Sequence, residues 1–425
     1  MKYKKYPSYK DSGVDWLGEI PKYWDCTHIG VLFDIKAGGD VKKEFFSEEK
    51  NNEFKYPIYT NTTVTTKVYG YSNRAFFKEN TITVTGRGDI GFAVYRDHKF
   101  DAIIRLLVLS PRNKENCKYF MYYINSVLNF NEGSSAINQL STEQIKPYKV
   151  LIPTKLEQQQ IATFLDNATA KIDTLIEKQT KQIELLKEKR QAVISHAVTK
   201  GINPNVPMKD SGVEWLGVIP EHWGTSPLKF LISEPLMYGA NESADRDNPN
   251  DPRYIRITDI KKDGTLHEHT FKSLPIEIAK PYLLKENSLL LTRTGATVGK
   301  SFLYEISWGV ACFAGYLIKA VISPNKALSK YVYYFTNTPN YWQWLKSSQI
   351  QATIENVSAE KYSSLSLPVP SLAEQRQIVE YIDEKTSKID ILIEKSNKSI
   401  ELLKEKRTAL ISAAVTGKID VREFE

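Results

Sequence analysis

The sequence has few of the features that mark a secreted or membrane-spanning protein. Its 425 residues include only three cysteines, Cys26, Cys117 and Cys312, which are far apart and form no Cys-x-x-Cys pair. This usage favours a reducing cytoplasm over secretion. No stretch approaches the roughly 18 uninterrupted apolar residues that a membrane helix needs, so we expect no membrane span. The basic start MKYKKYPSYK is followed by no apolar segment, and we expect no signal peptide.

Recognisable catalytic motifs are also missing. The chain has no His-Glu-x-x-His, no Gly-x-Ser-x-Gly and no paired Cys/His cluster. His267 and His269 lie close together in the sequence without evident further ligands, which favours a solvated loop over a metal site. The segment GATVGKS (295–301) resembles a phosphate-binding loop, but only three residues separate its glycines where the Walker A pattern has four. We therefore favour a structural turn, and a nucleotide-binding enzyme built on this loop stays open as an alternative.

What the sequence does contain is one unit written twice. KDSGVDWLGEIPKYW (10–24) recurs as KDSGVEWLGVIPEHW (209–223) with 11 of 15 positions identical, and IELLKEKR (183–190) recurs unchanged at 400–407. An internal repeat of this length decides the architecture before any local motif is read. Between these constant segments the sequence diverges, which suits constant parts that meet identical partners and variable parts that meet two different ones.

Each long constant segment predicts a helix. Residues 156–198 contain no proline or glycine, are rich in good helix formers, and place apolar residues three, four and seven apart. A continuous helix of this length would be roughly 60 Å long, which favours a coiled coil over a surface helix in each domain. Two matching apolar faces pack most economically about a pseudo-twofold axis, and an axis perpendicular to the helices makes them antiparallel.

The variable segments predict mixed α/β domains. In the first, 56–71 and 80–96 alternate β-branched and aromatic residues with turn signals, as strands do, and 118–126 is typical of a helix. In the second, strands are expected within 253–260, 287–304 and 315–322, followed by a helix over 330–337. The order is the same in both halves, so the sequence predicts one shared fold.

Charge is only weakly informative. The net charge is +7, and the variable segments 25–150 and 224–370 carry 17 basic against 14 acidic and 16 against 13 side chains. An excess of +3 in each permits nucleic-acid binding without demonstrating it.

Two polar loops in each half are candidates for reading bases. TGRGDIG (85–91) and TRTGATVG (292–299) place arginine, aspartate and threonine between glycines, and SSAINQLS (134–141) and SQIQATIENVS (348–358) are rich in amides and hydroxyls. Arginine reads guanine, aspartate accepts from cytosine, amides reach adenine edges, and glycine lets a backbone approach a ligand. Ordinary polar turns are the competing interpretation. The candidates are Arg87, Asp89, Asn138 and Gln139 in the first half and Arg293, Thr294, Thr297, Lys300 and Gln351 in the second, with Asn61, Lys67, Arg253 and Arg256 on nearby strand ends.

The repeated boxes supply four further candidates. Trp16, Trp24, Trp215 and Trp223 are candidate contacts for a partner subunit, or alternatively staples that hold each variable domain to its helix. The sequence does not separate the two interpretations.

These boxes, with the segments that end each variable domain, resemble the specificity subunits of Type I restriction–modification systems. The resemblance rests on GVDWLGEIPKYW and GVEWLGVIPEHW, and on LPVPSLAEQRQI (367–378) at the end of the second variable segment. Its counterpart LIPTKLEQQQI (151–161) departs from that pattern, with Lys155 where the second half has Pro370 and one residue fewer.

The resemblance implies a chain without enzymatic activity in a bacterial or archaeal cytoplasm. Two target-recognition domains would each read one half of a split, asymmetric site in double-stranded DNA, and the helix pair would set the unspecified spacer. Two modification subunits carrying S-adenosylmethionine would dock on the repeats, and restriction subunits using ATP and Mg²⁺ would join them. No cofactor is expected on this chain itself. A coiled-coil adaptor that touches no DNA is a further alternative.

The expected organisation combines the repeats with the resemblance. It comprises a first box (1–24), a target-recognition domain (25–153), a central long helix (154–200), a repeated box (201–223), a second target-recognition domain (224–370) and a C-terminal long helix (371–425). The expected fold class is mixed α/β, with two globular domains separated by a pair of long antiparallel helices.

Overall fold

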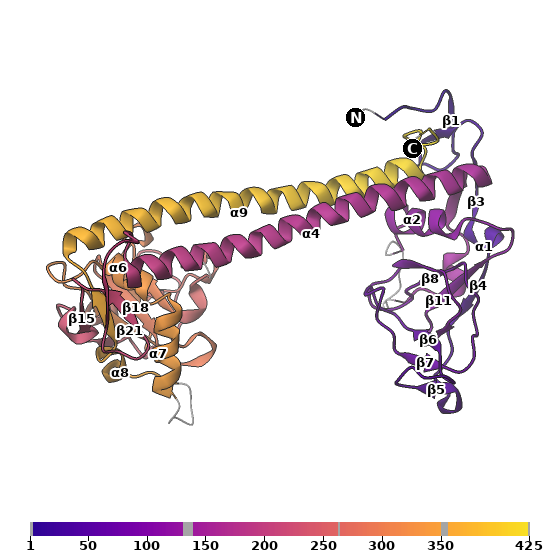
Figure 1. The fold of residues 1–425 in the computed structure, drawn as a ribbon. Coiled ribbons are helices and arrows are strands. Elements are labelled where there is room, and N and C mark those ends of the chain that lie inside the picture. Colours follow the sequence, from indigo (N-terminus) through magenta and orange to yellow (C-terminus); the bar gives the residue numbers. More distant parts are fainter. Residues whose placement is uncertain (1–2, 131–138, 262–263, 350–355, 424–425) are drawn as a thin grey trace. The chain divides into compact units, whose positions relative to one another are not determined.

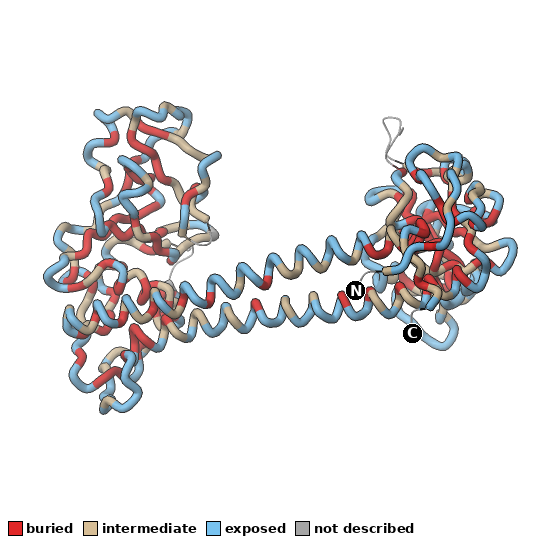
Figure 2. Tube along the Cα trace, turned by 90° about the horizontal axis from the view of Figure 1, so that it is seen from above, coloured by how far each residue is buried: buried red, intermediate tan, exposed pale blue. Residues whose placement is uncertain are grey.

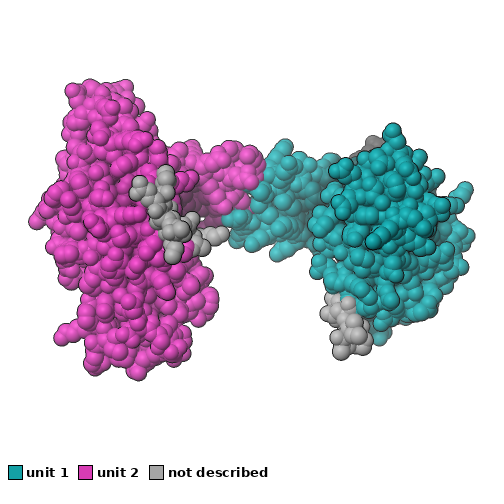
Figure 3. Space-filling model, turned by 90° about the horizontal axis from the view of Figure 1, so that it is seen from below, with its two compact units in different colours: residues 1–180, 397–425 teal, residues 181–396 magenta. Residues whose placement is uncertain are grey.

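The computed structural model describes residues 3–130, 139–261, 264–349 and 356–423, and it divides into two compact units. Residues 1–180 and 397–425 form one unit, and residues 181–396 form the other (Figure 3). The divisions fall within the long helices α4 (Lys155–Lys200) and α9 (Leu372–Val415), so each unit holds a stretch of both. The two helices predicted from the repeat are confirmed.

The first unit contains a box hairpin and two small sheets. The hairpin pairs β1 (Tyr9–Asp11) with β2 (Glu19–Pro21), and β3 (Asp25–His28) pairs with β12 (Lys149–Ile152). One sheet has the order β4 (Phe33–Ala37), β11 (Leu107–Pro111), β8 (Thr81–Val84), β9 (Ala93–Arg96) and is antiparallel throughout. The other has the order β10 (Asp101–Ala102), β6 (Tyr56–Tyr59), β7 (Gly70–Ser72), β5 (Phe46–Ser47). The helices are α1 (Ile29–Leu32), α2 (Cys117–Val127) and α3 (Thr142–Ile145).

The second unit repeats this plan. Its hairpin pairs β13 (Met208–Asp210) with β14 (Val218–Pro220), and β15 (Gly224–Pro227) pairs with β22 (Ser366–Val369). The main sheet has the order β16 (Met237–Tyr238), β21 (Leu317–Val321), β18 (Ser288–Thr292), β19 (Ser301–Leu303), and β17 (Arg253–Ile255) runs parallel to β20 (Ala311–Phe313). The helices are α5 (Ile276–Ala279), α6 (Ser329–Phe335), α7 (Pro339–Gln349) and α8 (Ala359–Ser363).

The shared fold predicted for the two variable segments is confirmed by strand order. In both main sheets, two central antiparallel strands are flanked by one early strand and one hairpin partner. The helix expected over 118–126 is α2, and the helix expected over 330–337 is α6. The segments 56–71 and 80–96, expected to contain strands and turns, each form two short strands separated by a loop, β6 and β7 in the first and β8 and β9 in the second.

Within each unit the stretches of α4 and α9 lie side by side and run antiparallel (Figure 1). In the first unit, Arg407 Nε donates to Asp173 Oδ1 at 2.9 Å, and Gln160 Nε2 donates to the carbonyl of Arg422 at 3.2 Å. In the second, Arg190 Nε donates to Asp390 Oδ1 at 2.9 Å. The two arginine–aspartate pairs involve equivalent positions of the repeat, as a pseudo-twofold arrangement requires.

Burial follows the apolar pattern of the helices. Ile161, Leu165 and Ile172 of α4 belong to the core of the first unit, and Ile378 and Ile382 of α9 belong to that of the second. Buried residues are dense within the domains and sparse along the exposed stretches of the long helices (Figure 2). Leu175 and Leu392, which the pattern also assigned to the apolar face, are 48% and 44% exposed. Ile183 and Ile389 are buried although they belong to neither domain core, so burial of the apolar face is continuous beside the cores and intermittent beyond them.

Candidate functional site

The loop between β8 and β9 in the first unit is held closed by its own backbone and by Thr85. The amide of Gly91 donates to the Thr85 carbonyl at 2.8 Å, the amide of Phe92 donates to Thr85 Oγ1 at 2.9 Å, and the Thr85 hydroxyl donates to the carbonyl of Asp89. Arg87 and Asp89 at the tip are exposed. A buried threonine thus fixes the loop from inside while its charged side chains face solvent.

Three predicted residues from distant parts of the sequence meet at this loop. Asn61 Oδ1 accepts from the amides of Gly86 at 2.7 Å and Arg87 at 3.3 Å, and the Arg87 guanidinium donates to Gln139 Oε1 at 3.3 Å. The backbone of Leu140 adds a bond to the carbonyl of Gly86 at 2.9 Å. We call Asn61, Thr85–Phe92 and Gln139 the first loop cluster. Asn138 lies outside the described residues.

The second unit builds an equivalent cluster from different side chains. Gly299 donates to the Thr292 carbonyl at 3.0 Å, and Val357 donates to the carbonyl of Arg293 at 2.9 Å, while Thr294 pairs with Asn356 as Arg87 pairs with Gln139. We call Thr292–Lys300 and Asn356 the second loop cluster. Gln351 lies outside the described residues.

Several polar atoms of the second loop cluster have no partner among the described residues. They are buried and comprise Thr292 Oγ1, Arg293 Nε, Thr297 Oγ1 and Asn356 Oδ1. In the first loop cluster the equivalent residue, Thr85, makes two hydrogen bonds through its hydroxyl. Unsatisfied buried groups carry a desolvation penalty, so this loop gains from any ligand or water that supplies partners.

Arg293 and Lys300 differ in how they are held. The guanidinium of Arg293 lies 4.7 Å from the centre of the Tyr238 ring, a cation–π distance, and the tyrosine hydroxyl accepts from the amide of Ala359 at 2.9 Å. Lys300 is exposed. Lys67 in the first unit is also exposed, in the turn closed by its own amide and the carbonyl of Val64.

Two of the candidates on strand ends, Arg253 and Arg256, use their guanidinium groups for interactions within the second unit. Arg253 is 7% exposed, donates to the carbonyl of His267 at 2.7 Å and lies 5.6 Å from the centre of the Phe271 ring. Arg256 makes a two-pronged ion pair with Asp259, which raises the pKa of the guanidinium. Both hold the loop that follows β17, so we no longer propose either as a base-reading residue.

GATVGKS has the backbone of a turn between two strands. Gly295–Thr297 forms a short 3-10 turn, and Ser301 begins β19, which pairs antiparallel with β18. A phosphate-binding loop requires a strand followed by a helix whose N-terminal amides cradle the phosphates. The strand–turn–strand arrangement does not provide that cradle, so the geometry does not support the nucleotide-binding alternative.

Two of the four box tryptophans are interior staples. Trp24 is fully buried and donates its indole N–H to Glu157 Oε1 at 3.3 Å, and Trp223, 1% exposed, donates to Glu374 Oε1 at 3.1 Å. The staple interpretation therefore replaces partner docking for Trp24 and Trp223. Trp16 is 55% exposed and Trp215 is half-buried, so only these two retain accessible indole surface.

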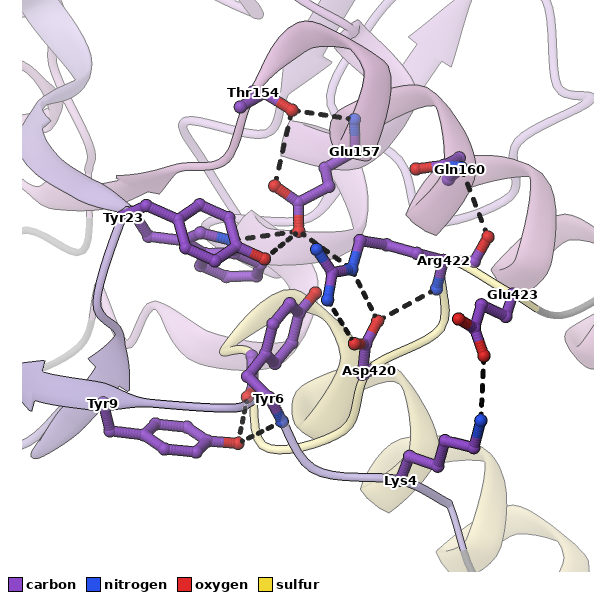
Figure 4. A network of polar contacts seen from close by, with 12 residues as sticks. Lys4, Tyr6, Tyr9, Tyr23, Thr154, Glu157, Gln160, Asp420, Arg422 and Glu423 are labelled. Atoms are coloured by element: carbon purple, nitrogen blue, oxygen red, sulfur yellow. Dashed lines mark hydrogen bonds and ion pairs between the residues drawn. The ribbon is translucent and has the colours of Figure 1, made fainter.

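In the first unit the polar contacts around Trp24 and Glu157 also involve residues near both ends of the chain (Figure 4). Tyr23 also donates to Glu157 at 3.1 Å, and Arg422, ion-paired with Asp420 at 2.5 Å, lies 4.9 Å from the centre of the Tyr6 ring. Desolvation raises the pKa of Tyr6, which therefore remains neutral. The segment after α9 thus packs against the first box. In the second unit, the segment that connects α4 to the second box occupies the equivalent position.

The residue after each stapling glutamate has its own structural task. Gln158 accepts from the amide of Asn116 at 2.9 Å, and Gln375 accepts from the amide of Leu328 at 2.8 Å. Each also donates to a carbonyl just before its own helix, that of Pro153 at 3.1 Å or Pro370 at 2.9 Å. Pro153, not Lys155, is therefore the structural counterpart of Pro370, and the spacing to the glutamine is the same in both halves. The Glu-Gln pair near the start of each long helix therefore fixes both the box and the domain helix, α2 or α6, to that long helix.

Comparison with known proteins identifies the family to which this arrangement belongs. The family model described as the Type I restriction modification DNA specificity domain matches twice, at residues 21–185 and 236–402. The chain belongs to this family. Each match contains one complete loop cluster, one Glu-Gln pair and part of one long helix.

Individual relatives agree with the family. A Mycoplasma pneumoniae protein described as a type I specificity subunit is 31% identical over 188 residues, which span 44% of this chain but only about half, 55%, of that protein. The Type I restriction enzyme MjaVIII specificity subunit of Methanocaldococcus jannaschii is 21% identical over 95% of each chain. A solved chain from work on complex assembly and conformational transition of the type I R-M system shares the fold, with a TM-score of 0.71 at 12% identity over 93% of this chain and 98% of that one.

Other kinds of site are not evident in the described parts of the specificity domains. No group of three or more His, Cys, Asp or Glu side chains that could hold a metal occurs among the described residues. His267 and His269 have ring centres 5.0 Å apart, and the His267 carbonyl serves Arg253. No helix within the described ranges is long and apolar enough to cross a membrane.

The sequence did not single out the residues that hold each specificity domain on its helices. Tyr119 lies within hydrogen-bonding distance of the carbonyls of Leu151 and Val415, at 3.3 and 3.1 Å, and Tyr331 lies 3.0 Å from those of Val198 and Pro368. Burial raises the pKa of both hydroxyls, which keeps them protonated as donors. The signal was available in the recurrence of Lys-Tyr near the start of α2 and α6, each upstream of a Glu-Gln pair.

A substitution at Gly299 tests how closely the second loop packs against α7. Its φ is +83°, and a Cβ added there would lie 2.2 Å from Leu345 Cδ2 and 3.0 Å from Trp342. We expect Gly299→Ala to lower the free energy of unfolding of the second unit by about 1–3 kcal/mol in urea titrations. Gly295→Ala is the matched control, because its φ is +77° with nothing within 4 Å of the added Cβ, and it should have the smaller effect. Equal losses would show that packing against α7 is unimportant.

Proposed function

We propose that this chain is the specificity subunit of a Type I restriction–modification complex and reads DNA without catalysing a reaction itself. The observation that carries the proposal is the double match to the DNA specificity domain, with one loop cluster in each copy. The clusters share a strand–loop–strand plan and an equivalent bridge but present different side chains, with Arg87 where the second has Thr294. Two domains of one fold with different tips are suited to two different half-sites of double-stranded DNA.

The side chains exposed at the tips of the two loops are suited to recognising DNA bases. Arg87 is exposed, and its guanidinium is oriented by Gln139, so one face is fixed while other N–H groups remain available for guanine. Asp89 is exposed beside it and can accept from cytosine. In the second domain Arg293 lies against Tyr238, which restricts its side chain in the same way. Restricting the side chain before binding reduces the entropy lost on contact with DNA.

The repeated parts of the chain suit docking of two copies of a modification subunit. The two boxes and the two long helices repeat the same surface elements, and Trp16 exposes most of its indole in the first box. We propose that modification subunits carrying S-adenosylmethionine dock on these repeats. Restriction subunits using ATP and Mg²⁺ would complete the assembly, and the helix pair would define the spacer between half-sites.

Single-molecule methylation mapping of the host genome, with this gene intact and deleted, tests the proposal. We expect deletion to abolish one bipartite adenine-methylated motif and leave other motifs unchanged. Exchange of residues 25–150 for those of a relative should then change one half of the motif only. Co-purification with a methyltransferase subunit distinguishes an inactive system from a wrong assignment. A chain that co-purifies with an active methyltransferase while its deletion leaves the methylome unchanged would refute the proposal.

A further inference from the structure

A strained turn lies beside the first loop cluster. Ile104 and Arg105 are consecutive non-glycine residues with φ of +55° and +60°, immediately before β11. The left-handed region costs L-residues roughly 1–2 kcal/mol each, and it is especially unfavourable for a β-branched side chain such as isoleucine. Strain of this kind persists only where the surroundings impose it, and it concentrates at functional sites.

The surroundings that impose it are partly those of the loop cluster itself. Ile104 and Arg105 donate their amides to the carbonyls of Gly39 at 2.9 Å and Gly38 at 3.1 Å. Asn61, which orients the amides of Gly86 and Arg87, donates its side-chain amide to the Ile104 carbonyl at 2.7 Å. One asparagine therefore ties the strained turn to the loop that carries Arg87.

The turn also touches the loop directly. A Cβ added to Gly86 would lie 3.0 Å from the carbonyl oxygen of Arg105, so the two backbones are in close contact. The Arg105 side chain is exposed, and among the described residues its guanidinium has no hydrogen-bond or ion-pair partner. The strained turn thus presents an exposed guanidinium, unpartnered among the described residues, from a backbone that contacts the loop carrying Arg87.

The second domain places another prominent side chain at the same position. Gly39 pairs in parallel with Ile103, and Ala240 pairs in parallel with Ala314, so Arg105 and Tyr316 each lie two residues beyond equivalent bridges. The Tyr316 carbonyl accepts from the amide of Arg293 at 3.0 Å, which mirrors the contact between Arg105 and Gly86. Tyr316 is 62% exposed, unusual for a large aromatic side chain.

We propose that Arg105 and Tyr316 are specificity-determining residues, each contacting bases of the half-site read by its own domain. The inference rests on the proposed function and adds to the predicted loops a position that their sequence motifs do not include. Arg105 supplies a guanidinium that can bond guanine O6 and N7 together, and Tyr316 supplies an apolar ring and a hydroxyl for base edges. Different residue types at one structural position give the two domains different preferences.

Arg105→Gly separates this role from a structural one. Glycine adopts the left-handed region freely, so the variant should keep or raise the melting temperature of the chain. In the complex with its methyltransferase subunits, we expect binding to cognate DNA to weaken by about 5-fold to 150-fold. Discrimination at one base pair of the first half-site should fall, and the second half-site should be read as before.

Lys114→Gly is the matched control. Lys114 is an exposed basic residue of the same domain with φ of +35°, beyond the opposite end of β11. Its replacement removes the same charge and the same type of strain, and we expect both half-sites to be read normally. Arg105→Lys should retain binding strength better than glycine but lose the discrimination, because lysine cannot make the two-pronged contact. Tyr316→Ala should relax one position of the second half-site only.

The outcomes separate the inference from the proposed function. If the wild-type complex shows no bipartite preference, the proposed function fails. If the wild-type complex reads a bipartite site and Arg105→Gly binds every sequence with the same proportional loss, Arg105 contacts phosphate and the inference is overturned. It is also overturned if Arg105→Gly and Lys114→Gly are indistinguishable in DNA binding.

Discussion

Trp24→Ala is expected to lower the free energy of unfolding of the first unit by about 3–5 kcal/mol. The indole is fully buried, packs edge-on against Tyr6 with ring centres 5.6 Å apart, and donates to the buried carboxylate of Glu157. Alanine leaves a cavity and removes a donor from a carboxylate that is itself 3% exposed. Urea unfolding, combined with hydrogen exchange to assign the loss to residues of the first unit, measures the effect.

Trp16→Ala is the control for that experiment. Trp16 belongs to the same box but is 55% exposed, so its loss should change stability by only about 0.5 kcal/mol. Association with the methyltransferase subunit is the complementary measurement, in which Trp16→Ala should have the larger effect on a folded chain. Similar stability losses for the two variants would contradict the division of the box into one staple and one exposed indole.

The architecture could be predicted from the sequence because the internal repeat and the apolar periodicity are both visible in the order of the residues. The absence of proline and glycine over 156–198 and the recurrence of IELLKEKR predicted α4 and α9, and the turns flanked by strands predicted the β8–β9 and β18–β19 loops. Asn61, Arg87 and Gln139 were each predicted as candidates because they are polar residues at strand ends or in loops, but their meeting at one loop is a finding of the structure. Their contact with DNA remains a prediction.

The sequence failed where a side chain's partner lies far along the chain. Arg253 has the sequence context of an exposed strand end, and nothing local indicates that the carbonyl of His267 and the ring of Phe271 enclose it. Tryptophans in a repeated box likewise permit docking or stapling, and only the position of Glu157 and Glu374 separates these. Helix α7, which begins at Pro339, was not predicted because α6 ends only four residues earlier.

The strained turn at Ile104 and Arg105 was not predicted, for a different reason. Isoleucine followed by arginine carries no signal for the left-handed region, which sequence reasoning assigns to glycine and asparagine. The conformation follows from the closure of β10 onto β6 and from the amide of Asn61, both long-range features. Backbone geometry therefore identified a candidate that composition could not.

Gln375→Met is expected to lower the free energy of unfolding of the second unit by about 2–4 kcal/mol. Methionine has nearly the same shape, so little cavity forms, but the Leu328 amide and the Pro370 carbonyl both lose their partner in a fully buried position. The Leu328 amide lies immediately before α6, so hydrogen exchange should accelerate first at the start of that helix.

Gln377→Met is the matched control, because Gln377 is exposed two positions further along α9. It should leave unfolding and exchange within error of the wild type. A neutral Gln375→Met would mean that α6 is fixed to α9 by apolar packing alone. The expected loss would instead show that the Glu-Gln pair repeated at the start of both long helices is kept for hydrogen bonding, the glutamate for the box and the glutamine for the domain. On that account Gln158→Met should produce the same effect at the start of α2, since the two pairs occupy the same place in a duplicated chain.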